Sequence, residues 1–69
     1  MKIRDYTLPE LEYFRQYCNF TNDELTYFNY KAKDLSNIEI SLKMNISTSQ
    51  VSKFAKRVSS KISRVIIDN

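Results

Sequence analysis

The side chains best suited to chemistry in this 69-residue sequence are the cations and short hydroxyl residues of its C-terminal third. Lys53, Lys56 and Arg57 can donate hydrogen bonds to phosphate oxygens or to the O6 and N7 atoms of guanine. The hydroxyl residues just before them can bond base edges or phosphates at close range. These residue types indicate recognition of a polyanion rather than the making or breaking of bonds.

The sequence contains few of the residue types that catalysis requires. The sequence has no glycine, which excludes glycine-rich phosphate loops and dinucleotide fingerprints. It has no histidine, the usual general base and the commonest metal ligand, and Cys18 is its one cysteine. We therefore expect neither enzymatic activity nor a metal or cofactor site.

Charge is unevenly distributed along the chain. Residues 1–39 carry five basic and seven acidic side chains, whereas residues 40–69 carry six basic side chains against Asp68 alone. Such asymmetry favours one face adapted to nucleic acid or to an anionic membrane surface. On charge alone, a solvated, lysine-rich face with no binding role is an equally good interpretation.

Four capping boxes indicate where helices begin. In this motif a Ser or Thr and a Glu or Gln three residues later satisfy backbone N–H groups of the first turn. The pairs are Thr7 with Glu10, Thr21 with Glu24, Ser36 with Glu39, and Ser47 with Gln50. Apolar residues at spacings of three and four follow each pair, which predicts helices over about 8–18, 22–34, 37–44 and 48–66. We expect an all-α chain, a single small four-helix domain over residues 1–69.

The third and fourth predicted helices are joined by only three residues, Asn45 to Ser47. A helix-turn-helix needs such a turn, with a first residue that tolerates the left-handed region, and asparagine is a good substitute for glycine there. Ser41 supplies the small side chain for close approach. The apolar set to be buried between the helices is Ile40, Met44, Ile46, Val51 and Phe54. The pattern predicts a helix-turn-helix over about 37–57.

Three segments carry a family resemblance: FTNDE at 20–24, LSNIEIS at 35–41 and ISTSQV at 46–51. They resemble the tetrahelical helix-turn-helix of LuxR/NarL-type response regulators and are similar to region four of bacterial sigma factors. Asp34 and Asn45 stand where that family commonly has glycine, and an additional helix precedes the motif. The resemblance implies that the fourth helix is a recognition helix read in the DNA major groove, that the function is transcriptional control, and that RNA polymerase is a further candidate partner.

The phase of the fourth helix selects the residues that would face DNA. With Val51, Phe54 and Val58 directed inward, the outward residues of its N-terminal half are Ser47, Thr48, Ser49, Ser52, Lys53, Lys56 and Arg57. Ser36 and Asn37 head the third helix, whose N–H groups could hold a phosphate, and Lys43 could contact the backbone of the other strand. The alternative is that the hydroxyl residues only cap the helix and the lysines only keep it soluble.

The fourth helix continues with a second apolar stripe, formed by Val58, Ile62, Val65 and Ile66. It either braces the first helix or forms a seam with a second copy of the chain. Because one helix-turn-helix reads few base pairs, we favour a homodimer with half-sites roughly one DNA turn apart.

These observations predict a small transcriptional regulator that binds double-stranded DNA sequence-specifically. No apolar run approaches the roughly 20 residues that cross a bilayer and the N-terminus lacks a signal-peptide core, so we expect a cytoplasmic protein without a membrane partner. The alternative is a protein-interaction module that uses the same scaffold to mask a polymerase, sigma factor or nuclease.

Overall fold

The computed structural model describes residues 3–68 of the chain. Within that range it contains a short 3-10 helix, η1 (Ile3–Asp5), and the helices α1 (Leu8–Tyr17), α2 (Asn22–Ala32), α3 (Asn37–Met44) and α4 (Thr48–Asp68). No strand occurs among these residues, so the predicted all-α, four-helix fold is confirmed. The helix starts agree with the prediction. The second helix ends two residues earlier than expected and the fourth ends two residues later.

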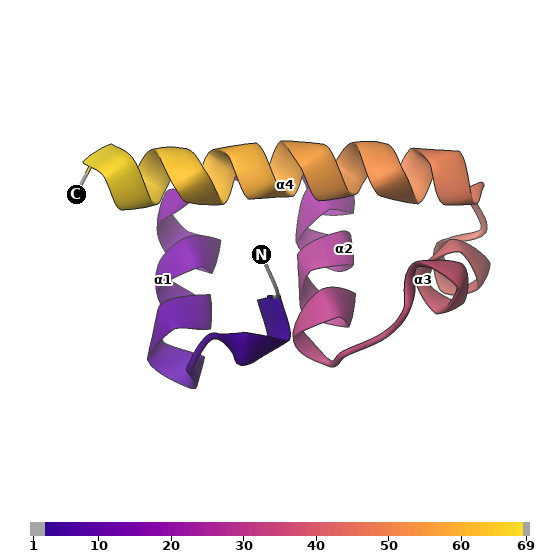
Figure 1. The fold of residues 1–69 in the computed structure, drawn as a ribbon, viewed down its shortest axis with the longest axis horizontal. Coiled ribbons are helices and arrows are strands. Elements are labelled where there is room, and N and C mark those ends of the chain that lie inside the picture. The colour runs from indigo at the N-terminus through magenta and orange to yellow at the C-terminus, as the bar shows by residue number, and fades with distance from the viewer. Residues whose placement is uncertain (1–2, 69) are drawn as a thin grey trace.

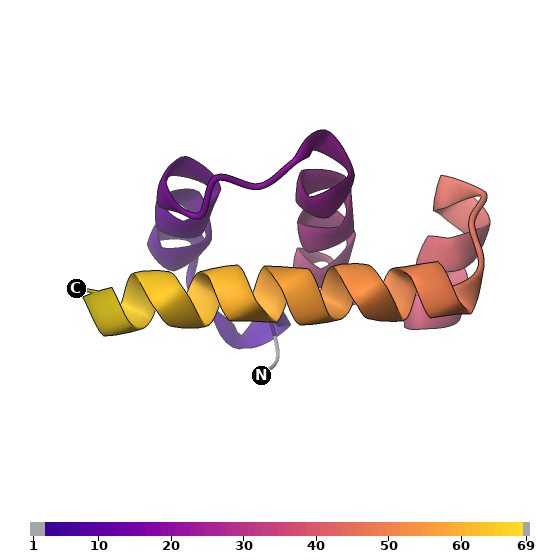
Figure 2. The ribbon, with the colours of Figure 1, turned by 90° about the horizontal axis from the view of Figure 1, so that it is seen from above.

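The longest helix, α4, extends along the whole molecule, which measures 34 × 19 × 19 Å (Figure 1). Helices α1 and α2 stand side by side across it, and α3 lies beside its N-terminal end. Both views place α1, α2 and α3 on one side of α4 (Figure 2). One long face of α4 is therefore left uncovered by the other helices.

The helix starts form as the capping boxes predict. At α1, α2 and α3 the cap hydroxyl accepts the backbone N–H of the glutamate three residues later, and that carboxylate accepts the backbone N–H of the cap. At α4 the Gln50 N–H donates to the Ser47 hydroxyl over 3.2 Å. Each box satisfies donors that the first turn of a helix would otherwise leave without a partner.

The turn between α3 and α4 depends on Asn45, which has the positive φ of 57° that its place in the motif predicts. The Ile46 N–H donates to the Ser41 carbonyl over 3.0 Å, and the Asn45 N–H donates to the Leu42 carbonyl. This is the double hydrogen bond of a Schellman ending, which normally uses glycine. Asp34, after α2, has φ 65° and ends that helix before its expected limit.

The core lies between the inner face of α4 and the other helices. Its buried apolar residues are Ile3, Leu11, Phe14, Cys18, Tyr27, Phe28, Ile40, Val51, Val58 and Ile62. Val58 and Ile62 are 0% exposed within a single chain, so neither can contribute to a seam with a second copy. The expectation of a four-residue seam is thus corrected: these two side chains brace α4 against its own core.

Candidate nucleic-acid interface

The predicted DNA contacts at the start of α4 all lie on the surface. The exposed residues are Ser47, Thr48, Ser49, Ser52, Lys53, Lys56 and Arg57. Their orientation follows from burial on the opposite side of the helix, where Val51 and Val58 are fully enclosed. At 3.6 residues per turn, burying these valines directs Lys53, Lys56 and Arg57 toward solvent.

The predicted contacts from α3 are also exposed. The Ser36 hydroxyl accepts the Glu39 N–H over 3.2 Å, and the Glu39 carboxylate accepts the Ser36 N–H over 3.4 Å. This cap places a negative charge at the helix end that was expected to hold a phosphate. Lys43 is exposed near the other end of α3.

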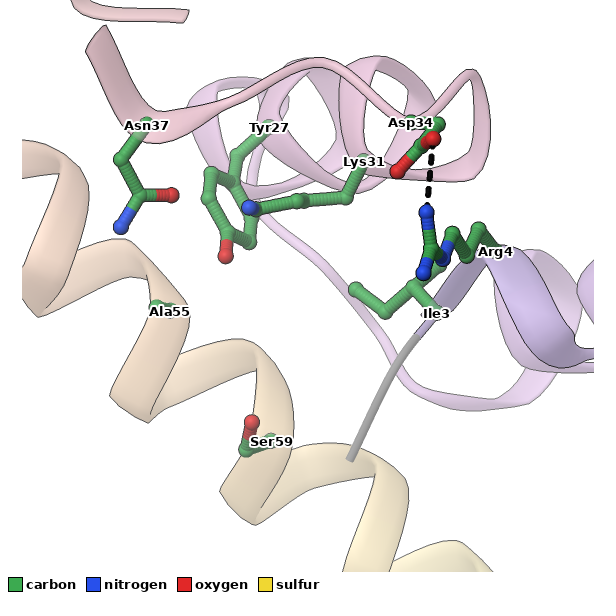
Figure 3. Close-up of a pocket in the computed structure, with 8 residues that line it drawn as sticks. All are labelled: Ile3, Arg4, Tyr27, Lys31, Asp34, Asn37, Ala55 and Ser59. Atoms are coloured by element: carbon green, nitrogen blue, oxygen red, sulfur yellow. Dashed lines mark hydrogen bonds and ion pairs between the residues drawn. The ribbon is translucent and has the colours of Figure 1, made fainter.

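Asn37 points into a hollow of about 380 Å³ between η1, α2, the start of α3 and α4 (Figure 3). There it faces Ala55 and Ser59, which lie on a different side of α4 from Lys53 and Arg57. The Arg4 guanidinium donates to Asp34 over 2.7 Å at the edge of this hollow. The hollow therefore adjoins the outer face of α4 at Ser59 but lies on a different side of the helix from Lys53 and Arg57.

The positive surface of α4 extends further than the sequence analysis proposed. Lys61 and Arg64 continue the spacing of three and four residues that begins at Lys53. We use the name basic ridge for the five cations Lys53, Lys56, Arg57, Lys61 and Arg64. A shallow groove of about 260 Å³ is lined by four of these cations, Lys56, Arg57, Lys61 and Arg64, together with Ser60. The periodic signal for Lys61 and Arg64 was present in the sequence, but the predicted contacts stopped at Arg57.

Lys61 differs from the rest of the ridge because it also holds the fold together. Its ammonium forms an ion pair with Glu24 and donates to the Asn19 carbonyl over 3.0 Å. Glu24 is only 3% exposed, and it also accepts the Thr21 N–H over 3.0 Å. Burial by itself would raise the pKa of Glu24, but the hydrogen bonds from Lys61 and Thr21 outweigh it, and the pKa lies below its ordinary value. The carboxylate therefore stays charged and ties α2 to α4.

The other four ridge cations, Lys53, Lys56, Arg57 and Arg64, form no ion pair with any residue between 3 and 68. By contrast, Arg4 pairs with Asp34, and Arg15 pairs with Glu12. No acidic residue occurs in the sequence between Ile40 and Ile67. The outer face of α4 thus carries positive charge that the described part of the chain leaves available.

What remains of the expected seam lies at the far end of α4. Val65 is partly buried and Ile66 is 52% exposed. Both line a largely apolar hollow of about 380 Å³ with residues of α1, namely Pro9, Glu10, Tyr13 and Phe14. Leu8 and Tyr17, also on α1, are exposed as well. An apolar surface therefore lies at the opposite end of α4 from the α3–α4 turn.

Comparisons with protein-family models, curated proteins and solved structures found no match to this chain. None of the helices in the described residues is long and apolar enough to cross a membrane. Among residues 3–68 no group of three or more Cys, Asp or Glu side chains is placed to hold a metal ion.

Proposed function

We propose that the chain binds double-stranded DNA sequence-specifically, with α3 and α4 acting as a helix-turn-helix, and that it serves as a small transcriptional regulator in the cytoplasm. The observation that carries this proposal is the exposed outer face of α4, which has no acidic residue from Thr48 to Ile67. Four cations that form no ion pair with any residue between 3 and 68 lie there, on a helix that begins directly after a three-residue turn. Clustered Lys and Arg on one helix face are the electrostatic footprint of a nucleic-acid-binding protein.

The chemistry of each exposed side chain suggests its role in DNA binding. Ser49 and Ser52 are small, so the helix backbone can approach the bases closely. Lys53 is long enough to reach guanine O6 or N7 in the major groove, which distinguishes base pairs. Arg57, one turn further along, suits a phosphate, which fixes position but carries no sequence information.

The structure also gives a reason to favour DNA over an anionic membrane surface. Helices that lie in a membrane interface bury a free apolar face in the lipid. The apolar face of α4 is occupied, because Val51, Val58 and Ile62 are 0% exposed beneath the other helices. Between Val51 and Ile62 the face of α4 that remains free is polar and basic, which matches a phosphate backbone.

The test is selection of duplexes from a random pool by the purified chain, followed by titration of the recovered site and a scrambled site. Lys53→Ala should lose roughly 1–3 kcal/mol on the recovered site and relax preference at one base position. Arg57→Ala should weaken both duplexes about equally. Lys33→Ala, an exposed cation away from α4, is the matched control and should change neither. Recovery of no common motif would contradict sequence-specific binding.

One observation favours the second candidate function, a protein-interaction module. Ile38 and Leu42, one turn apart on α3, are 66% and 76% exposed. Exposed apolar side chains paired on one helix face fit a protein partner, such as a polymerase, sigma factor or nuclease. Leu42→Asp separates the two functions. It should leave DNA titrations unchanged if DNA is the target, whereas loss of polymerase co-elution without any duplex binding would favour the interaction module.

We also propose that two copies associate through the apolar surface formed by Val65, Ile66 and α1. A second copy is the occupant that fits, because this surface lies at the far end of α4 and pairing there leaves both α3–α4 turns free for DNA. Two chains would read two half-sites, as helix-turn-helix dimers do.

A further inference from the structure

The positive charge of α4 is centred on the middle of the helix rather than on its N-terminal tip. The first turn, Thr48 to Val51, contains no cation, and the basic ridge begins only at Lys53. It continues to Arg64, which lies about 16 Å further along the helix axis. Midway between these ends are Arg57 and Ser60.

This distribution does not fit a helix that enters the groove by its tip. Arg64 lies about 24 Å beyond Thr48 along the helix axis. The major groove of B-DNA is only about 8.5 Å deep. A helix pointing into the groove would thus hold Arg64 well outside it, and the distal part of the ridge would meet no phosphate.

The outer face of α4 is clear along its length. Small exposed side chains accompany the cations, namely Ser49, Ser52, Ser60 and Ser63. The large apolar residues Ile66 and Ile67 are exposed only beyond the ridge. Helices α1, α2 and α3 all lie on the opposite side (Figures 1 and 2). Tyr17 and Asn19 lie beside Lys61 and Arg64 at one edge of the ridge, and Arg64 remains exposed there, so a duplex can lie alongside the ridge.

We propose that α4 lies lengthwise against duplex DNA, centred near Arg57 and Ser60, and that Arg64 is a phosphate contact. This inference rests on the proposed DNA-binding function and specifies its geometry. The partner chemistry is a continuous line of phosphates, since a duplex presents one negative charge about every 1.7 Å of its axis. The ridge presents its cations over about 16 Å of such a line.

The test is the dependence of DNA affinity on salt for the full wild-type chain and four variants, Arg64→Met, Arg64→Lys, Arg57→Ala and Lys33→Ala. Arg64→Met keeps most of the side-chain length but removes the charge. Each lost phosphate contact lowers the magnitude of the slope of log affinity against log salt by about 0.9. We expect that reduction for Arg64→Met, its restoration in Arg64→Lys, and no change in Lys33→Ala. Circular dichroism of each variant establishes that the helices are intact.

The outcomes separate this inference from the function on which it rests. An unchanged slope in Arg64→Met, together with a reduced slope in Arg57→Ala, would show tip-first binding and overturn the lengthwise geometry while leaving DNA binding intact. A wild-type chain that binds no duplex, or binds without salt dependence, would overturn both.

Discussion

Replacing Lys61 by methionine should destabilise the fold by about 2 kcal/mol. Removing one partner of a buried ion pair costs roughly 3–5 kcal/mol, because the remaining charge stays buried without compensation. Here the cost should fall below that range for two reasons. The Lys61 side chain is 27% exposed, so water reaches the pair, and Glu24 keeps the Thr21 N–H at 3.0 Å. Methionine preserves the apolar part of the side chain, so the lost stability measures the contribution of the ammonium group.

Urea unfolding followed by circular dichroism measures this change. A chain of this size should have a slope near 1 kcal/mol per molar urea, so the midpoint should fall by about 2 M. Lys56→Met is the matched control, since Lys56 is exposed on the same helix and forms no ion pair within residues 3–68. Its midpoint should move by less than about 0.5 M. Equal midpoints for the two variants would refute the structural role assigned to Lys61.

The same pair predicts how stability depends on pH. Because the pKa of Glu24 is lower in the folded chain than its ordinary value, the folded state holds this carboxylate in its charged form more strongly than the unfolded state does. Its contribution is complete above about pH 4.3, the ordinary value for glutamate, and is lost as the pH falls through the lower folded pKa. Glu24→Gln should therefore show a shallower loss of stability between about pH 5 and 2 than the wild type. Parallel pH profiles would contradict the lowered pKa.

Two further predictions concern the turn and the assembly. Asn45→Gly should leave the urea midpoint unchanged or slightly raised, whereas Asn45→Val should cost about 1–2 kcal/mol, because a β-branched residue fits the observed φ of 57° poorly; equal midpoints would contradict this account of the turn. Ile66→Glu should lower the mass measured by sedimentation at ~100 μM, a concentration far above the range in which specific DNA binders work. If the wild-type chain is a monomer at that concentration, both free and on DNA, the dimer is refuted.

The helices could be predicted from the sequence because their determinants are local. A capping box joins residues three apart, and all four boxes mark the observed helix starts. The turn at Asn45 was likewise predictable, since few residues other than glycine accept a positive φ. Ile40 and Val51, expected in the core, are fully buried, as the helical spacing requires.

The features that sequence reasoning missed depend on contacts between distant residues. Glu24 and Lys61 are 37 positions apart, and no local pattern indicates that they meet. Burial of Val58 and Ile62 depends on how far the other helices cover α4. Their apolar character alone therefore did not decide between packing against the first helix and contact with a second copy of the chain. Arg64 was missed for a different reason. The resemblance to known recognition helices implied DNA contacts in the N-terminal half of α4, although the spacing of basic residues continues beyond it.

The arrangement of α4 determines how its salt dependence can be interpreted. Lys61 already neutralises Glu24, so its charge belongs largely to the fold, and a weaker affinity after its removal would mix lost stability with lost contact. The remaining ridge cations, Lys53, Lys56, Arg57 and Arg64, are free to neutralise phosphates. If all four do so, one chain gives a slope of log affinity against log salt of about −3.6, and a pair of chains on two half-sites gives about −7. Between 50 and 200 mM salt these slopes correspond to losses of roughly 10² and 10⁴ in affinity. The slope on a palindromic site therefore counts the chains bound, independently of any measurement of mass.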